Sequence, residues 1–178
     1  AGGSTVFRRF LREELLPEVE RRYRTTPERA IIGESLAGLF VVETFLEDPS
    51  LFTHFVALDP SLWWNECAIL DSAPARLAAL DASPRSLYLA NSQDDIADGT
   101  TRLAALLQAS PPSGLRWRHE PRPDLTHATI FRALELTALL GIDRLDPLRR
   151  DVQRLDQLLV QDTRATSGDG AQGDLLVP

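Results

Sequence analysis

The chain has 178 residues, of which 43% are hydrophobic and 25% charged, values typical of one globular domain with a sizeable core. The formal net charge of −7 and the absence of a basic stripe argue against a nucleic-acid partner. The single cysteine, Cys67, rules out an internal disulfide, and three histidines without a Cys/His cluster predict no metal site. No apolar run approaches the roughly 20 residues of a membrane span, and nothing in the sequence calls for a cofactor.

The first predicted element is an amphipathic helix over residues 4–24, in which Pro17 should cause a kink or a break. The residues before it lack the basic start and the apolar stretch of a signal peptide. Cytoplasm and periplasm therefore both remain open as compartments. We expect the strands that precede this helix in the domain to lie in an upstream segment or in a second chain.

A short apolar strand from Arg29 to Gly33 leads through Glu34 to Ser35, and a helix is predicted from Leu36 to Leu46. A buried strand that turns sharply into a helix, with a serine at the turn, is the sequence form of a nucleophile elbow. The turn exposes the serine hydroxyl. This stretch therefore predicts a serine nucleophile.

Strands alternate with helices along the rest of the chain, which predicts an α/β fold with a parallel sheet and helices on both faces. Asp98 is expected to cap the helix that begins at Thr100. The predicted strands are 52–58, 87–90 and an edge-like 115–120; the predicted helices are a broken 66–80, 100–108, one running to about 140, and 147–159; a disordered tail covers 163–178.

Polar residues follow the predicted strands at several points: Ser35, Asp59, Asp94, Asp95 and His127. In parallel sheets, ligands bind beyond the carboxyl ends of the strands, so these side chains should gather at one edge. A serine becomes nucleophilic when a histidine takes its proton and a carboxylate orients that histidine. The order of Ser35, a later aspartate and His127 is the nucleophile, acid and base order of one hydrolase class.

The other two histidines have structural interpretations. His54 begins an apolar strand, and His119 lies within an alternating strand, so both should be structural residues. Trp63 and Trp64 follow a strand end, and we expect one to pack inward and the other to line a substrate cleft.

Three segments resemble the putative-esterase (esterase D-like) family of α/β-hydrolases, in particular its enterobactin (siderophore) esterase branch. They are Gly33-Glu-Ser35-Leu-Ala-Gly38-Leu, Asp59-Pro-Ser-Leu-Trp-Trp64 and Thr126-His127-Ala-Thr-Ile, and the resemblance covers about residues 4–140. It implies a three-layer α/β-hydrolase-type sheet without its N-terminal strands, in which residues 1–162 form the C-terminal part of one domain.

Carried over by position, the resemblance makes Ser35 the nucleophile, His127 the base and Asp95 the acid, with Asp94 as second choice for the acid. Some members of the branch are described as working without a conventional acid. The backbone N–H of Leu36 would form one half of the oxyanion hole, and a loop upstream of this chain would supply the other half. The isolated chain would be inactive without that loop.

The sequence departs from the family pattern at two positions. Ala37 replaces the second glycine of the elbow, and its methyl group must fit into a crowded turn. Glu34 replaces a histidine beside the nucleophile; its negative charge should disfavour anionic substrates or raise the pKa of His127.

The resulting expectation is a serine esterase that acts through an acyl-enzyme on siderophore-like or other small acyl esters. Glu34, Leu36, Trp63 and Trp64 would contact the substrate. Two alternatives stay open: an acyltransferase of the same fold, and a catalytically silent hydrolase-fold module used for binding.

Overall fold

The computed structural model describes residues 3–144, and side chains as far as Glu135. The chain divides into two compact units, residues 1–142 and 143–178, and the first unit contains the whole sheet. The predicted helix over 147–159, the tail from 163 and the domain boundary at 162 lie outside the described residues. None of the described helices is both long enough and apolar enough to span a membrane.

Within residues 3–144 the sheet has four parallel strands, which lie side by side in the order of the sequence. This arrangement confirms the predicted α/β class, and it places β1 and β4 at the two edges. The third strand, β3, is buried along its whole length, as expected for a central parallel strand. The strands are β1 (Ala30–Glu34), β2 (His54–Leu58), β3 (Arg85–Ser92) and β4 (Leu115–Arg122).

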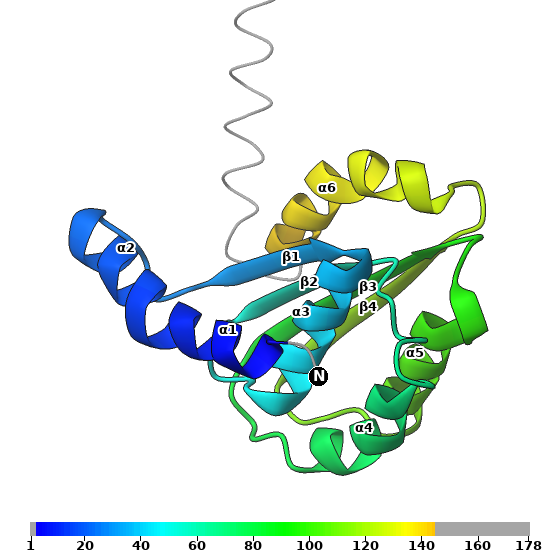
Figure 1. Cartoon of the computed structure of the whole chain (residues 1–178), viewed down its shortest axis with the longest axis horizontal. Coiled ribbons are helices and arrows are strands. Elements are labelled where there is room, and N and C mark those ends of the chain that lie inside the picture. The colour runs from blue at the N-terminus through cyan, green and yellow to red at the C-terminus, as the bar shows by residue number, and fades with distance from the viewer. Residues whose placement is uncertain (1–2, 145–178) are drawn as a thin grey trace, which may run out of the picture. The chain divides into compact units, whose positions relative to one another are not determined.

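Helices cover both faces of the sheet, so that the unit has three layers (Figure 1). On one face, α3, α4 and α5 pack with the sheet into the larger core, in which Phe45 and Phe55 are fully buried. On the other face, α6 buries Ile130 and Leu134 against Val56 and Tyr88. The helices are α3 (Ser35–Glu47), α4 (Ala68–Ala78), α5 (Gly99–Ala109) and α6 (His127–Arg144), and a short 3-10 helix, η2 (Ile96–Asp98), precedes α5.

The N-terminal helical run absorbs Pro17 through a change of helix type. Helix α1 (Ser4–Phe10) passes into the π-helix η1 (Leu11–Leu15) and then into α2 (Leu16–Arg22). A proline lacks the N–H that an α-helix needs, and a π-turn just before it changes the hydrogen-bonding pattern where that bond is missing. The single predicted helix is therefore split at the expected place.

The helix predicted over residues 66–80 is expected to break at Pro74. In the structure, α4 runs through Pro74 without a break. The side chain of Pro74 is exposed to solvent. Its neighbours Ala73 and Leu77 are buried in the larger core and hold the helix in place.

Candidate active site

The turn between β1 and α3 has the geometry of a nucleophile elbow. Ser35 follows the last residue of β1 and opens α3 with a φ of 56°, which is the left-handed region that side chains rarely adopt. A Cβ atom at Gly33 would lie 2.4 Å from the carbonyl oxygen of Ala37, and one at Gly38 would lie 3.0 Å from Cα of Pro60. The crowded positions are thus the two glycines, whereas Ala37 is exposed and its methyl group fits.

The hydroxyl group of Ser35 lies 3.3 Å from the hydroxyl group of Ser61, which is buried in the segment after β2. The backbone N–H of Ser61 also donates to the carbonyl oxygen of Ser35 at 3.0 Å. Leu36 is the second residue of α3, so its N–H is one of those that the helix cannot pair internally. The turn therefore places the hydroxyl group of Ser35 beside a backbone N–H that has no partner within the helix.

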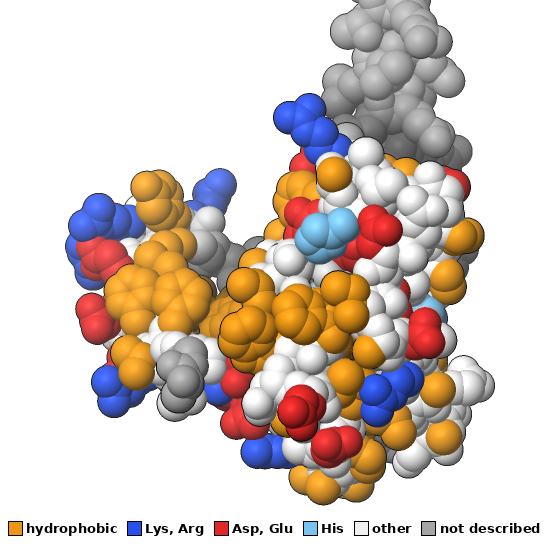
Figure 2. Space-filling model, turned by 45° about the vertical axis from the view of Figure 1, so that its right-hand side comes forward, with side chains coloured by type: hydrophobic (Ala, Val, Ile, Leu, Met, Phe, Trp, Pro, Cys, Tyr) orange, Lys and Arg blue, Asp and Glu red, His pale blue; other side chains and the backbone are white. Residues whose placement is uncertain are grey.

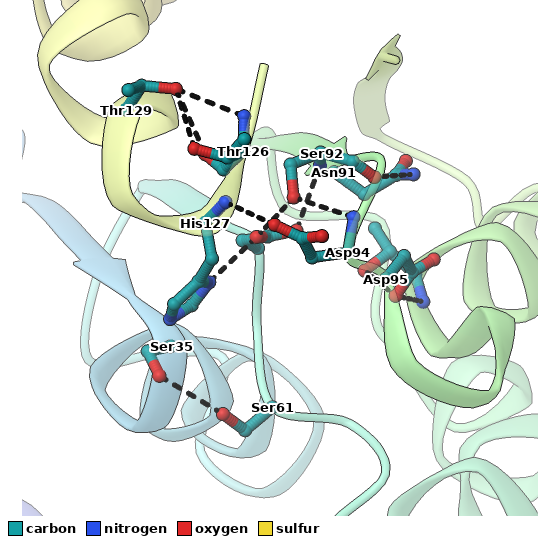
Figure 3. A network of polar contacts seen from close by, with 11 residues as sticks. Ser35, Ser61, Asn91, Ser92, Asp94, Asp95, Thr126, His127 and Thr129 are labelled. Atoms are coloured by element: carbon teal, nitrogen blue, oxygen red, sulfur yellow. Dashed lines mark hydrogen bonds and ion pairs between the residues drawn. The ribbon is translucent and has the colours of Figure 1, made fainter. Parts of the chain in front are cut away.

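His127 is the first residue of α6 and reaches the site from the opposite face of the sheet. Its backbone N–H donates to Oδ2 of Asp94 at 2.8 Å, which fixes the start of the helix. Its ring Nδ1 lies 2.7 Å from Oδ2 of Asp59, and the ring points toward Ser35 (Figure 3). About half of the His127 side chain is exposed, which leaves room for a reacting molecule.

Asp59 is the carboxylate that meets His127. It follows β2 directly, with a φ of 45°, and only 3% of its side chain is exposed. Besides the His127 ring, the backbone N–H and the hydroxyl group of Ser92 donate to it, at 2.9 and 2.7 Å. Three donors thus hold a buried carboxylate in one orientation, which is what an acid that orients a histidine requires.

Asp95, the expected acid, makes no hydrogen bond to the ring of His127; Asp59 occupies that place in the structure. The Asp95 carboxylate accepts hydrogen bonds from the N–H and hydroxyl groups of Thr100, both at 3.3 Å, and from the N–H of Thr101 at 3.4 Å. It therefore caps α5, a role expected for Asp98, whose side chain makes no capping bond. Burial raises the pKa of Asp95.

One signal in the sequence could have identified Asp59. Like Ser35, it stands directly after an apolar strand, at the same edge of the sheet. The family resemblance instead predicted an acid in the loop after the third strand, at Asp95.

Glu34 ends β1 next to the nucleophile and is partly buried. Burial raises the pKa of its carboxyl group, the nearby His127 opposes that shift, and the negative charge of Asp59 adds to it. Glu34 thus lies within electrostatic reach of both His127 and Asp59.

Two hollows adjoin at this edge. A pocket of about 330 Å³ is lined by Ser35, Asp59, Pro60, Ser61, Trp63, Asp94, Asp95, Ile96 and His127. A larger hollow of about 1080 Å³ shares Trp63 with it and is also lined by Leu36, Phe40 and Trp64. Acidic side chains flank a histidine above a band of hydrophobic side chains (Figure 2).

The expectation that one tryptophan would pack inward is wrong. Trp63 and Trp64 are 38% and 54% exposed, because both belong to the wall of the larger hollow. Their ring centroids lie 6.0 Å apart. Leu36 is exposed as well. Three apolar side chains are thus exposed in the wall of the larger hollow.

The other histidines pair with residues of the sheet. His54 Nδ1 lies 2.8 Å from the hydroxyl group of Ser86, and His119 Nε2 lies 2.6 Å from Oδ1 of Asn91. Burial lowers the pKa of His119. Within the described part of the chain, no group of three or more His, Cys, Asp or Glu side chains could hold a metal ion.

The chain is similar in sequence to proteins that are named as esterases. Ferri-bacillibactin esterase BesA of Bacillus subtilis (strain 168) is 44% identical over 70 residues, which make up 39% of this chain and 24% of that protein. Siderophore triacetylfusarinine C esterase of Aspergillus fumigatus is 33% identical over 76 residues, or 42% of this chain and 26% of that protein.

Among solved structures, an IroE-like serine hydrolase from Shewanella oneidensis is 26% identical, with a TM-score of 0.70. The match covers 92% of this chain and 56% of that one. The chain thus spans about a quarter of the length of the curated relatives and just over half of this structure. The family model described as "Putative esterase" matches residues 1–113. The chain belongs to this esterase family and has its α/β-hydrolase type of fold.

Proposed function

We propose that this chain supplies the nucleophile, base and acid of a serine esterase that hydrolyses small carboxylic esters, siderophore-like esters among them. The observation that carries the proposal is the ring of His127, which Asp59 holds at 2.7 Å through Nδ1 and which points toward Ser35. The relatives named as siderophore esterases support the substrate class.

The proposed reaction follows from this arrangement. With Nδ1–H donating to Asp59, Nε2 of His127 is free to take the proton of the Ser35 hydroxyl as its oxygen attacks the ester carbonyl. The N–H of Leu36 stabilises the developing oxyanion. His127 then gives the proton to the leaving alcohol, and a water molecule, activated by the same ring, releases the acid and restores Ser35.

The hydroxyl group of Ser35 contacts Ser61 in the free protein, and a rotation about its Cα–Cβ bond would redirect it to the ring of His127. Catalytic hydrogen bonds often tighten only when substrate binds, so the free geometry is compatible with this role.

A second oxyanion donor is proposed to come from a segment outside this chain, upstream of it or in a second chain. Such a segment would also pair with β1, which is an edge strand in the described sheet. Removing one oxyanion donor costs roughly 10²–10³ in rate. We therefore expect full activity only from the full-length protein, which the assays use.

A fluorophosphonate probe tests the proposal directly, because it reacts only with an activated serine. We expect the full-length protein to be labelled at Ser35, as identified by peptide mass spectrometry, and the Ser35→Ala variant to remain unlabelled. The Ser61→Ala variant is the matched control, since it removes a neighbouring hydroxyl group and should still be labelled. A folded protein that is not labelled at Ser35 would instead favour a binding module.

Ser61 is expected to orient the nucleophile. Its buried hydroxyl group contacts that of Ser35, and a hydrogen bond of this kind contributes about 1 kcal/mol, so Ser61→Ala should lower kcat/KM about fivefold. The change should appear in kcat, measured with a nitrophenyl ester. An unchanged kcat would show that Ser61 does not position Ser35.

A further inference from the structure

The pocket at Ser35 carries negative charge that no arginine in the described structure pairs with. Asp94 and Asp95 line the pocket, and Glu34 stands directly before Ser35 at the end of β1. None of the residues that line the pocket is an arginine. None of the ion pairs found in the described part of the chain involves Glu34, Asp94 or Asp95.

Two of the three carboxylates that line the neighbouring hollow are paired with arginines of the described chain, and the third, Glu66, is not. Glu43 pairs with Arg8 at 3.3 Å, and Glu47 pairs with Arg76 at 2.9 Å. Most of the unpaired carboxylates at this edge, namely Glu34, Asp94 and Asp95, therefore lie at the pocket that contains the nucleophile.

The one basic side chain among the described residues that line the pocket is the ring of His127, and Asp59 already pairs with it. A carboxylate or sulfonate group on the substrate would enter a partly enclosed space next to like charges, where water screens poorly. A quaternary ammonium group would instead be attracted by the carboxylates and by the face of Trp63, which lines the same pocket.

We infer that the pocket selects esters by charge, accepting acyl groups that are cationic or neutral near the scissile carbonyl and disfavouring anionic ones. This inference rests on the proposed esterase function and deepens it. Glu34 and Asp94 are the residues that set the preference, and Trp63 provides the surface for the apolar part of the acyl group.

The test uses three nitrophenyl esters of butanoic acid that differ only in their terminal group. The group is trimethylammonium, tert-butyl or sulfonate, so that the first two have nearly the same shape. With the full-length protein at about pH 8, where carboxylates are ionised, kcat/KM should fall in that order. The cationic ester should exceed the anionic one about 100-fold at low salt, within the range known for electrostatic steering.

Salt provides a second readout, since screening shortens the reach of exposed charges. Raising the ionic strength from about 0.01 M to about 0.5 M should reduce the ratio of cationic to anionic kcat/KM at least about fivefold. A selectivity that arose from shape alone would not change with ionic strength.

Two variants locate the charge. Glu34→Gln and Asp94→Asn should each lower the cationic to anionic ratio about threefold to tenfold, and Asn at that position still offers an oxygen to the N–H of His127. Asp71→Asn is the control, because it changes the net charge equally at an exposed position of α4 that lines neither hollow. This control should leave the ratio unchanged.

The outcomes separate the two proposals. Equal rates for the three esters, or a preference for the anionic one, with turnover that depends on Ser35, would overturn the charge selection and leave the esterase function standing. A ratio that changes as much in Asp71→Asn as in Glu34→Gln would also overturn it. Absence of Ser35-dependent turnover with all three esters would overturn the esterase function and the inference with it.

Discussion

The Asp59→Asn substitution is expected to lower kcat about 10⁴-fold while the protein stays folded. The carboxylate of Asp59 accepts a hydrogen bond from Nδ1 of His127 and so keeps the lone pair of Nε2 toward Ser35. An asparagine amide can present its NH₂ group to the ring, which favours the wrong tautomer and removes the charge that stabilises the imidazolium. Ester turnover by the full-length variant measures the loss, and circular dichroism checks the fold.

Asp95→Asn is the matched control, because it changes the other candidate acid in the same way. It weakens the capping of Thr100 and Thr101, so it should cost about 0.5–2 kcal/mol of stability, and we expect kcat to change less than about tenfold. A result in which Asp95→Asn abolishes turnover and Asp59→Asn spares it would restore the acid suggested by the family resemblance.

A double substitution shows whether Asp59 acts through His127. Residues that act as one unit are not additive, so Asp59→Asn combined with His127→Ala should be about as slow as His127→Ala alone. A further large loss in the double variant would mean that Asp59 serves the reaction by another route.

Gly33→Ala is expected to lower the free energy of unfolding by about 3 kcal/mol, the upper part of the usual range for overpacking. A Cβ atom there would lie 2.4 Å and 2.5 Å from the carbonyl oxygen and carbon of Ala37, and 2.9 Å from the backbone nitrogen of Gly38. These are backbone atoms of α3, so the helix itself must move. For a chain of this size the melting temperature should fall by about 6–12 °C.

The same displacement should damage the active site, because the first turn of α3 holds Ser35. A shift of about 1 Å can cost roughly 10² in rate, so turnover should fall even below the melting temperature. Gly3→Ala is the control: nothing lies within 4 Å of its added Cβ atom, and we expect a loss of at most about 1 kcal/mol. Equal melting temperatures for the two variants would show that the turn at Gly33 has room for a Cβ atom.

Much of the fold could be predicted from local patterns. Apolar runs bounded by turn residues indicated all four strands, and the helical spacing of apolar residues indicated α3, α5 and α6. The predictions from sequence failed at positions where tertiary packing outweighs local propensity. Pro74 is tolerated because its helix is held by buried neighbours, and both tryptophans stand exposed because they belong to the wall of a hollow.

The sequence by itself determined the elbow at Ser35 and the candidacy of His127. Both depend on local features of the sequence: glycine at a crowded turn, and a histidine at the start of the helix that follows a strand. Only the tertiary structure decided which aspartate serves that histidine. Asp59 stands directly after β2 and Asp95 lies in the loop after β3, so both belong to the same edge of the sheet, but a hydrogen bond depends on side-chain direction in space. The left-handed backbone at Asp59 and the donors of Ser92 hold its carboxylate at the ring of His127, whereas the threonines at the start of α5 occupy Asp95.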